Sequence, residues 1–232
     1  THCISSAASD VYKRQEEVVA LSNASEALNL AANTLGTRLG PRDEVVITIM
    51  EHHSNLVPWQ LVCERTGAKL RWFDITDDGQ LDLDKAEREG LINEHTKVVS
   101  LALASNVLGT INPVQRIAQW AHQVGAVVVV DASQAVPQMP VNVTELGADL
   151  LAFTGHKMLG PTGIGILWGR YDLLDDLPPF LGGGEMIEVV RMTGSTYAKP
   201  PHRFEAGTPP IAQLAALGVA ADYLDEVGMA AI

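Results

Sequence analysis

The sequence predicts an α/β protein with a mostly parallel sheet that helices cover on both faces. From Glu16 onward, short apolar runs alternate with segments of helical periodicity. The run at 127–130 is four consecutive valines, which is typical of a strand buried on both faces of a parallel sheet. Polar residues follow several of the runs directly, and ligands bind at the carboxyl ends of the strands in such sheets.

Each element follows from its local pattern. The first helix places Leu28, Ala31, Ala32 and Leu35 on one face. The expected strands cover residues 18–21, 45–50, 69–73, 97–104, 127–130, 150–153 and 165–168. The expected helices cover residues 24–39, 56–65, 82–89, 114–124 and 211–227. Glycine at 182–184 and proline at 200–201 predict a loop-rich region before the last helix.

Composition excludes several classes of protein. The apolar content of 47% fits a globular protein with a sizeable core. The formal net charge of -12 argues against nucleic acid as a partner, because phosphate binding needs a basic face. No apolar run approaches the length of a membrane span, and no signal peptide is visible. Cys3 and Cys63 make no disulfide framework, which indicates a reducing, cytoplasmic compartment.

The two ends of the chain differ from the rest. Residues 1–15 show no helical or strand period, and they resemble a translated cloning tail, with a genuine flexible N-terminus as the alternative. Residues 16–232 are expected to form the α/β domain. The last helical pattern stops abruptly near Ile232, so we expect the chain to be a fragment.

Two strand ends carry an acid and a lysine. Asp131 follows the run at 127–130, and Lys157 follows the run at 150–153, so both should reach the same edge of the sheet. Pyridoxal 5'-phosphate enzymes need a lysine that forms a Schiff base and an acid that keeps the pyridine nitrogen protonated. The pair therefore predicts this cofactor. The plainer alternatives are a solvated lysine and an aspartate that caps a turn.

Other strand ends supply polar groups to the same rim. His52 and His53 follow the strand at 45–50, and a histidine there can stack on a ring and move protons. Asn106 follows the strand at 97–104. Gln134 lies one turn beyond Asp131, where it can hydrogen-bond a ring hydroxyl oxygen.

The start of the first helix is a possible phosphate site. Asn23 can serve as the N-cap, with Glu26 as its capping-box partner. A helix N-terminus with free N–H groups binds phosphate readily. Thr154 and His156 can add side-chain donors. Cys63 is predicted to be a small buried apolar residue, and no metal site is predicted.

At this point the motifs resemble a known family, the group II (SufS-type) cysteine desulfurases of the class V aminotransferase fold. The match runs from about residue 16 to the end of the chain. The motifs that carry it are EHHSNLVPWQ at 51–60, SNVLGT at 105–110, DASQ at 131–134, GHKMLGPTGIG at 155–165, GGGEMI at 182–187 and RFEAGTP at 203–209.

The resemblance implies the large domain of a fold type I enzyme and assigns roles by position. Lys157 would carry the cofactor, Asp131 would pair with the ring nitrogen, and His52 would stack on the ring. Asn106 and Gln134 would lie near the ring oxygen. The residues implied to hold the phosphate are Ala24, Ser25, Thr154 and His156, with Thr208 reaching the phosphate of a neighbouring subunit in a homodimer.

The implied reaction converts L-cysteine to L-alanine and leaves a persulfide on an enzyme cysteine, which supplies sulfur through an acceptor protein to iron-sulfur cluster assembly. The family's catalytic cysteine and its substrate-carboxylate arginine lie in a C-terminal small domain that this chain lacks. We therefore expect the chain to be inactive in sulfur transfer. The family also has Arg-Gly-Thr-Thr-Glu where this chain has Ser22-Asn23-Ala24-Ser25-Glu26, so we expect weaker cofactor retention.

Two alternatives remain open. One is another class V enzyme: a selenocysteine lyase, an epimerase or an aminotransferase. The other is a nucleotide-binding module or inactive scaffold, which predicts a Gly-x-Gly-x-x-Gly turn after the first strand. Residues 22–25 contain no glycine, which disfavours the second alternative.

Overall fold

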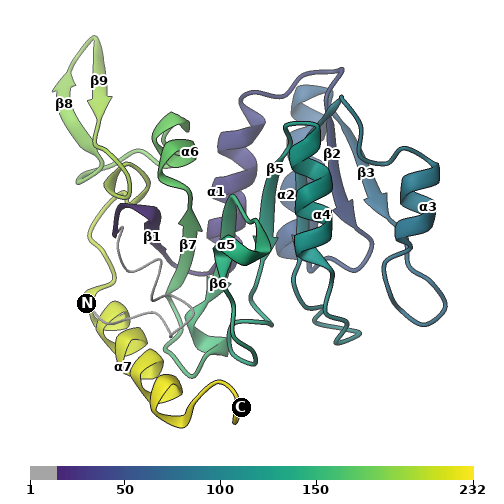
Figure 1. The fold of residues 1–232 in the computed structure, drawn as a ribbon. Coiled ribbons are helices and arrows are strands. Elements are labelled where there is room, and N and C mark those ends of the chain that lie inside the picture. Colours follow the sequence, from purple (N-terminus) through teal and green to yellow (C-terminus); the bar gives the residue numbers. More distant parts are fainter. Residues whose placement is uncertain (1–14) are drawn as a thin grey trace.

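A seven-stranded sheet forms the centre of the computed structural model, which describes residues 15–232 (Figure 1). Its strand order is β1-β7-β6-β5-β4-β2-β3. The strands are β1 (Val18–Leu21), β2 (Glu44–Thr48), β3 (Lys69–Phe73), β4 (Thr96–Ala102), β5 (Val127–Asp131), β6 (Leu150–Thr154) and β7 (Gly165–Gly169). All neighbouring pairs are parallel except those of β7, which runs antiparallel to both β6 and β1. The predicted mostly parallel α/β sheet is confirmed.

Helices cover both faces of this sheet. They are α1 (Ala24–Gly36), α2 (His53–Thr66), α3 (Leu83–Arg88), α4 (Val114–Gln123), α5 (Val143–Leu146), α6 (Tyr171–Asp176) and α7 (Ile211–Val227). Short 3₁₀ turns occur at Gln15–Glu17 (η3), Gly155–Lys157 (η4) and His202–Phe204 (η5). Of the described residues, none belongs to a helix long and apolar enough to cross a membrane.

Two apolar cores, one on each side of the sheet, hold the layers together. Alternate strand residues point to opposite faces, so Val45 and Val46 of β2 belong to different cores. One core packs α1, α2 and α6 against the sheet, and the other packs α3, α4 and α7. Both faces of the central strands are therefore covered by apolar side chains, which explains the unbroken valine run at 127–130.

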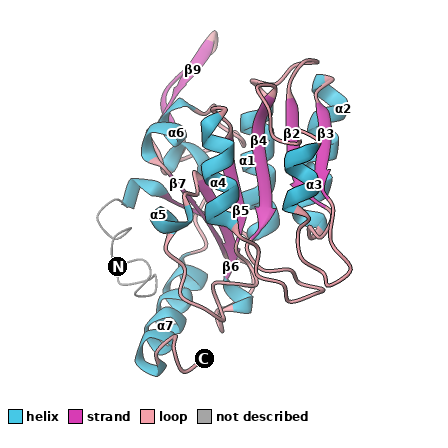
Figure 2. Cartoon of the chain, turned by 45° about the vertical axis from the view of Figure 1, so that its right-hand side comes forward, coloured by secondary structure: helices cyan, strands magenta, loops and turns pink. Residues whose placement is uncertain are grey.

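The short elements were not predicted. Helices α5 and α6 have four and six residues, too few for a helical period to stand out. The region expected to be loop-rich contains a hairpin of β8 (Ile187–Arg191) and β9 (Gly194–Tyr197), so that prediction is wrong there. Figures 1 and 2 show the hairpin projecting from one end of the molecule, with α7 at the other end. Most of its residues are exposed, so the hairpin lacks the alternating burial that reveals a strand in a sequence.

Several predicted boundaries also shift. The first helix ends at Gly36, three residues before the predicted end, and β4 stops at Ala102 where residue 104 was expected. Helix α2 begins at His53, three residues before the predicted start, because His52 acts as its N-cap. The prediction for residues 1–15 lies outside the described residues except at Gln15, which begins a 3₁₀ turn.

Glycine at position 165 lets β7 start directly against the N-terminus of α1. A Cβ atom at Gly165 would lie 2.4 Å from the carbonyl carbon of Asn23 and 2.5 Å from its Cα. Those atoms are backbone, so no side-chain rotation could relieve the contact. The glycine therefore fixes how closely the first turn of α1 approaches β7.

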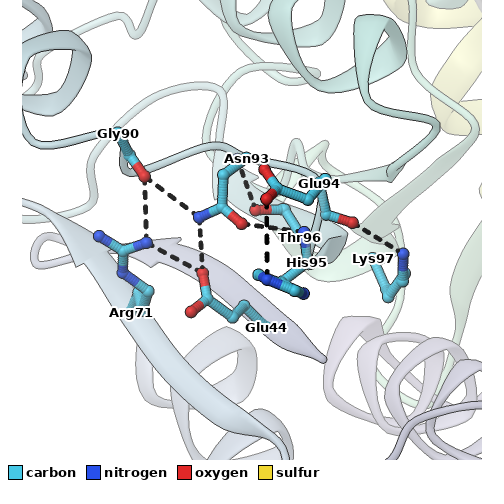
Figure 3. A network of polar contacts seen from close by, with 8 residues as sticks. All are labelled: Glu44, Arg71, Gly90, Asn93, Glu94, His95, Thr96 and Lys97. Carbon is cyan, nitrogen blue, oxygen red and sulfur yellow. Dashed lines mark hydrogen bonds and ion pairs between the residues drawn. The ribbon is translucent and has the colours of Figure 1, made fainter. Parts of the chain in front are cut away.

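At the opposite edge of the sheet, where β2 begins, a partly buried ion pair links β2 to β3 (Figure 3). Glu44 at the start of β2 accepts hydrogen bonds from Arg71 and from Asn93, both at 2.9 Å. Arg71 and Asn93 also donate to the carbonyl of Gly90, each at 3.1 Å. Burial alone would raise the pKa of Glu44, but these hydrogen bonds and the charges of Arg71 and Lys69 outweigh it and lower the pKa.

Gly165→Ala is expected to lower the free energy of unfolding by about 1–3 kcal/mol, because the new methyl group must push apart two backbone segments. Urea denaturation measures the change. Gly182→Ala is the matched control, since nothing lies within 4 Å of a Cβ atom there. Equal stability of the two variants would contradict the close approach.

Arg71→Met is expected to lower the free energy of unfolding at pH 7 by about 2 kcal/mol, because it leaves the Glu44 carboxylate buried with one fewer charged donor. A lowered folded-state pKa stabilises the protein above the ordinary carboxyl pKa, and this stabilisation is lost as the pH falls through the folded-state value.

The difference between wild type and Arg71→Met should therefore shrink below about pH 4. Denaturation curves across this pH range provide the check. Arg38→Met is the control, because its ion pair with Asp176 is mostly exposed and should contribute little. A pH-independent difference would show that the charge of Glu44 is not the cause.

Candidate functional site

A pocket opens where β4, β5 and β6 end, beside the first turn of α1. The strand register brings these ends level, since Ala102 pairs with Asp131 and Asp131 pairs with Ala152. On the other side, Gly165 pairs with both Thr154 and Leu21. The predicted residues that line the pocket are Ala24, Ser25, His52, Asn106, Asp131, Gln134, Thr154, His156 and Lys157.

Asp131 and Lys157 lie on the wall of this one pocket, as expected from their strands. Asp131 is the last residue of β5 and is buried, and its Oδ1 accepts a hydrogen bond from the amide of Ser133 at 2.9 Å. Among the described residues no donor reaches Oδ2, so this oxygen can accept from a ligand. Lys157 follows β6 in the η4 turn and is half-buried. The pocket therefore combines a carboxylate acceptor with a primary amine.

His52 contributes an imidazole whose tautomer is set by the backbone. As N-cap of α2, its Nδ1 accepts the amide N–H of Ser54 at 3.1 Å. The neutral ring must then carry its proton on Nε2. Its neighbour His53 does not line the pocket, although the two ring centroids lie 5.9 Å apart. Of the two histidines, His52 is therefore the one that lines the pocket.

The first turn of α1 presents amide and hydroxyl donors to the pocket. Asn23 caps the helix, with its side chain accepting from the amide of Glu26 at 2.9 Å. Glu26 accepts from the amide of Ser22 at 2.6 Å, so the predicted capping box reaches one residue further back than expected. Amides in a first helical turn have no intrahelical acceptor, which favours an anion there.

Side-chain hydroxyls extend this donor set across the pocket. The hydroxyls of Ser25 and Ser54 lie 2.6 Å apart, and that of Ser54 lies 3.0 Å from Nδ1 of His52. On the opposite wall, Oγ1 of Thr154 and Nδ1 of His156 are 3.1 Å apart. The contact between Ser25 and Ser54 joins the first turns of α1 and α2 at the pocket wall.

Thr208 is the one predicted site residue that lies elsewhere. It is exposed and lines a second pocket, formed by residues 20–22 and 204–210 with Glu26, Gly163 and Leu181. Glu205 closes this region by accepting the amide of Ala20 at 2.8 Å. Among the described residues that line the first pocket, Thr208 is not included, so its role toward a neighbouring subunit stays a prediction.

Several residues of the pocket, and one buried acid next to its wall, were not predicted from the sequence. The lining also includes Ser54, Ala102, Ala104 and Ser133, small residues without a motif of their own. Behind the wall, burial raises the pKa of Glu51 to about 7, against the hydrogen bonds of Thr48, Asn55 and Ala102 and aided by the charge of Asp131. An acid immediately after a buried strand and before His52 was the available signal. Within residues 15–232, no group of three or more His, Cys, Asp or Glu side chains is arranged to hold a metal ion.

Solved structures share this arrangement of elements. The cysteine desulfurase CsdA from Escherichia coli superposes with a TM-score of 0.91 at 35% identity, over 97% of this chain and 57% of that one. A cysteine desulfurase from Thermococcus onnurineus superposes with a TM-score of 0.90 at 41% identity, over 96% of this chain and 55% of that one.

Curated proteins are similar in sequence as well. A probable cysteine desulfurase of Streptomyces coelicolor is 62% identical over 220 residues, which cover 93% of this chain and 52% of that protein. A cysteine desulfurase of Haloferax volcanii is 50% identical over 216 residues, which cover 93% of this chain and 50% of that protein. The chain thus spans about half the length of these relatives. Residues 10–232 match the family described as Aminotransferase class-V, and the chain belongs to the class V aminotransferase family.

Proposed function

We propose that the chain is the pyridoxal 5'-phosphate-binding domain, residues 16–232, of a cysteine desulfurase. The observation that carries the proposal is the shared pocket of Asp131 and Lys157, beside the donor-rich first turn of α1. The proteins that are named cysteine desulfurases, and to which this chain is 35–62% identical, support it.

The residues of the pocket fit the chemical groups of this cofactor. The free Oδ2 of Asp131 suits a protonated ring nitrogen, and the amine of Lys157 suits an aldehyde carbon. The amides of Ala24 and Ser25, with Thr154 and His156, suit a phosphate. His52 would stack on the ring, and Asn106 and Gln134 would lie near its hydroxyl oxygen.

When bound, pyridoxal phosphate supplies an electron sink for the carbon that carries the substrate amino group. The residues of the chain act around that chemistry. Asp131 would hold a proton at the ring nitrogen, and the half-buried Lys157 would provide the amine that holds the aldehyde carbon. The neutral ring of His52 carries its proton on Nε2, the nitrogen that does not accept from Ser54.

The substrate we infer is L-cysteine, with selenocysteine as the chemical relative that the same pocket would accept. The products would be L-alanine and a persulfide on an enzyme cysteine. An acceptor protein would carry the sulfur to iron-sulfur cluster assembly. The low cysteine content fits a reducing cytoplasm.

Cys63 does not fit the sulfur-accepting role. It lies within α2 with 7% of its surface exposed, and burial raises the pKa of its thiol to about 11. A nucleophilic cysteine must be accessible and ionised. The accepting thiol of the complete enzyme would therefore lie outside the described residues.

A homodimer would complete the site, with Thr208 reaching the phosphate bound by the second copy. The exposure of Thr208 outside the first pocket supports this arrangement. Helix α7 also leaves Ile211, Val219 and Tyr223 exposed, and such apolar faces are typical of surfaces that another chain covers.

Lys157→Ala is expected to abolish the visible absorbance band of lysine-bound pyridoxal phosphate, because the amine that forms the covalent bond is removed. Titration of the protein with the cofactor, followed by absorbance, measures this. Lys97→Ala is the control, since Lys97 lies in β4 far from its carboxyl end and donates only to the carbonyl of Glu94. An unchanged band in Lys157→Ala would overturn the assignment.

The chain carrying Cys3→Ser is expected to release no sulfide or persulfide from L-cysteine, because its remaining thiol, at position 63, is buried and protonated. A methylene blue sulfide assay measures release. Cys63→Ser should bind the cofactor as wild type does, and iodoacetamide should label Cys63 only after unfolding. Sulfide production that disappears in Cys63→Ser would contradict this account of the thiol.

A further inference from the structure

Glu51 is an enclosed carboxylate that three elements hold in place. Its Oε1 accepts the hydroxyl of Thr48 at 2.5 Å and the amide of Ala102 at 3.0 Å. Its Oε2 accepts the side-chain amide of Asn55 at 2.7 Å. These donors come from the last residue of β2, the first turn of α2 and the last residue of β4. One acid therefore joins the ends of two strands to the start of a helix.

The orientation of Asn55 is itself fixed, so the network has no freedom to rearrange. Its Oδ1 accepts the hydroxyl of Ser100 at 2.6 Å and the indole N–H of Trp59 at 3.3 Å. Both groups are donors in this arrangement, so Nδ2 must face Glu51. The amide of Ala102 is likewise a fixed backbone donor.

A carboxylate is the only common side chain of this shape that satisfies all three donors. A glutamine has one oxygen and one NH₂ group. If its oxygen faced Thr48 and Ala102, its NH₂ group would meet Nδ2 of Asn55, donor against donor. If the side-chain amide of the glutamine were flipped, its NH₂ group would face Ala102, and the backbone amide of Ala102 would lose its acceptor. Either way a buried donor is left unpaired, which is costly in the interior.

Both ends of this network continue into the pocket wall. His52 follows Glu51 directly in the chain and lines the pocket. Ala102 also lines it and pairs in the sheet with Asp131. The backbone segments that carry His52 and Asp131 are thus joined through a single buried acid, which does not itself line the pocket.

We propose that Glu51 is a positioning residue, which holds the turn carrying His52 against the end of β4 so that His52 and Asp131 keep a fixed separation across the cofactor ring. The inference rests on the proposed cofactor site and adds to it the group that sets the site's geometry. In this proposal Glu51 acts through its neighbours and takes no part in the chemistry.

Glu51→Gln tests the proposal, with Glu44→Gln as the matched control. Glu44 is a buried acid that begins β2, whereas Glu51 follows the end of that strand, and Glu44 is held by Arg71 and Asn93. Both substitutions remove a buried charge and should lower the unfolding temperature. Only Glu51→Gln should raise the dissociation constant for pyridoxal phosphate, by roughly tenfold as for other partners that orient site residues. It should also reduce the visible circular dichroism of the bound cofactor, which reports its asymmetric surroundings.

Thr48→Val is a milder second variant in case Glu51→Gln does not fold, since it removes one donor and preserves shape. It should shift the dichroism in the same direction by a smaller amount. If either folded variant lowers the unfolding temperature but keeps the wild-type affinity and dichroism, Glu51 is only structural and the proposal is overturned. If the wild-type protein binds no pyridoxal phosphate, the proposed function itself is wrong. Titration of the wild-type protein alone shows this, without any Glu51 variant.

Discussion

The register of the parallel strands is the constraint on which the rest of the structure depends. Ala102 of β4 pairs with Asp131 of β5, and Asp131 pairs with Ala152 of β6. Because these residues lie in one row, the ends of the three strands open into the same pocket. A slip of one residue would turn Asp131 toward the other face of the sheet. The buried valine run of β5 opposes such a slip, since both of its faces are packed. Site geometry and core packing are therefore fixed by the same pairing.

Two close contacts then bring the helices to that row. Gly165 admits the backbone of Asn23 and so sets the first turn of α1 beside β7 and β6. Glu51 joins the start of α2 to the end of β4 through three hydrogen bonds. The serine pair Ser25 and Ser54 closes the gap between the two helix starts. Donors that suit a phosphate, an acceptor that suits a ring nitrogen and an amine thus line one pocket.

Most of the sheet and the pocket could be predicted from sequence, because apolar runs mark strands and the residues that follow them share an edge. Asp131 and Lys157 were found in this way. Short helices such as α5 and the exposed hairpin carry too little pattern to be recognised. Glu51 was missed because its role depends on Ala102 and Asn55, partners that only the fold brings together. Thr208 lines a second pocket apart from the other predicted residues, and the role toward a neighbouring subunit that the resemblance implies stays a prediction.

The most direct test of the central claim is to locate the covalent bond between the protein and its cofactor. The chain is incubated with pyridoxal 5'-phosphate, reduced with borohydride, digested and analysed by mass spectrometry. The account predicts a pyridoxyl group on the peptide that contains Lys157. Label spread over surface lysines such as Lys69 and Lys97, with Lys157 unmodified, would contradict it.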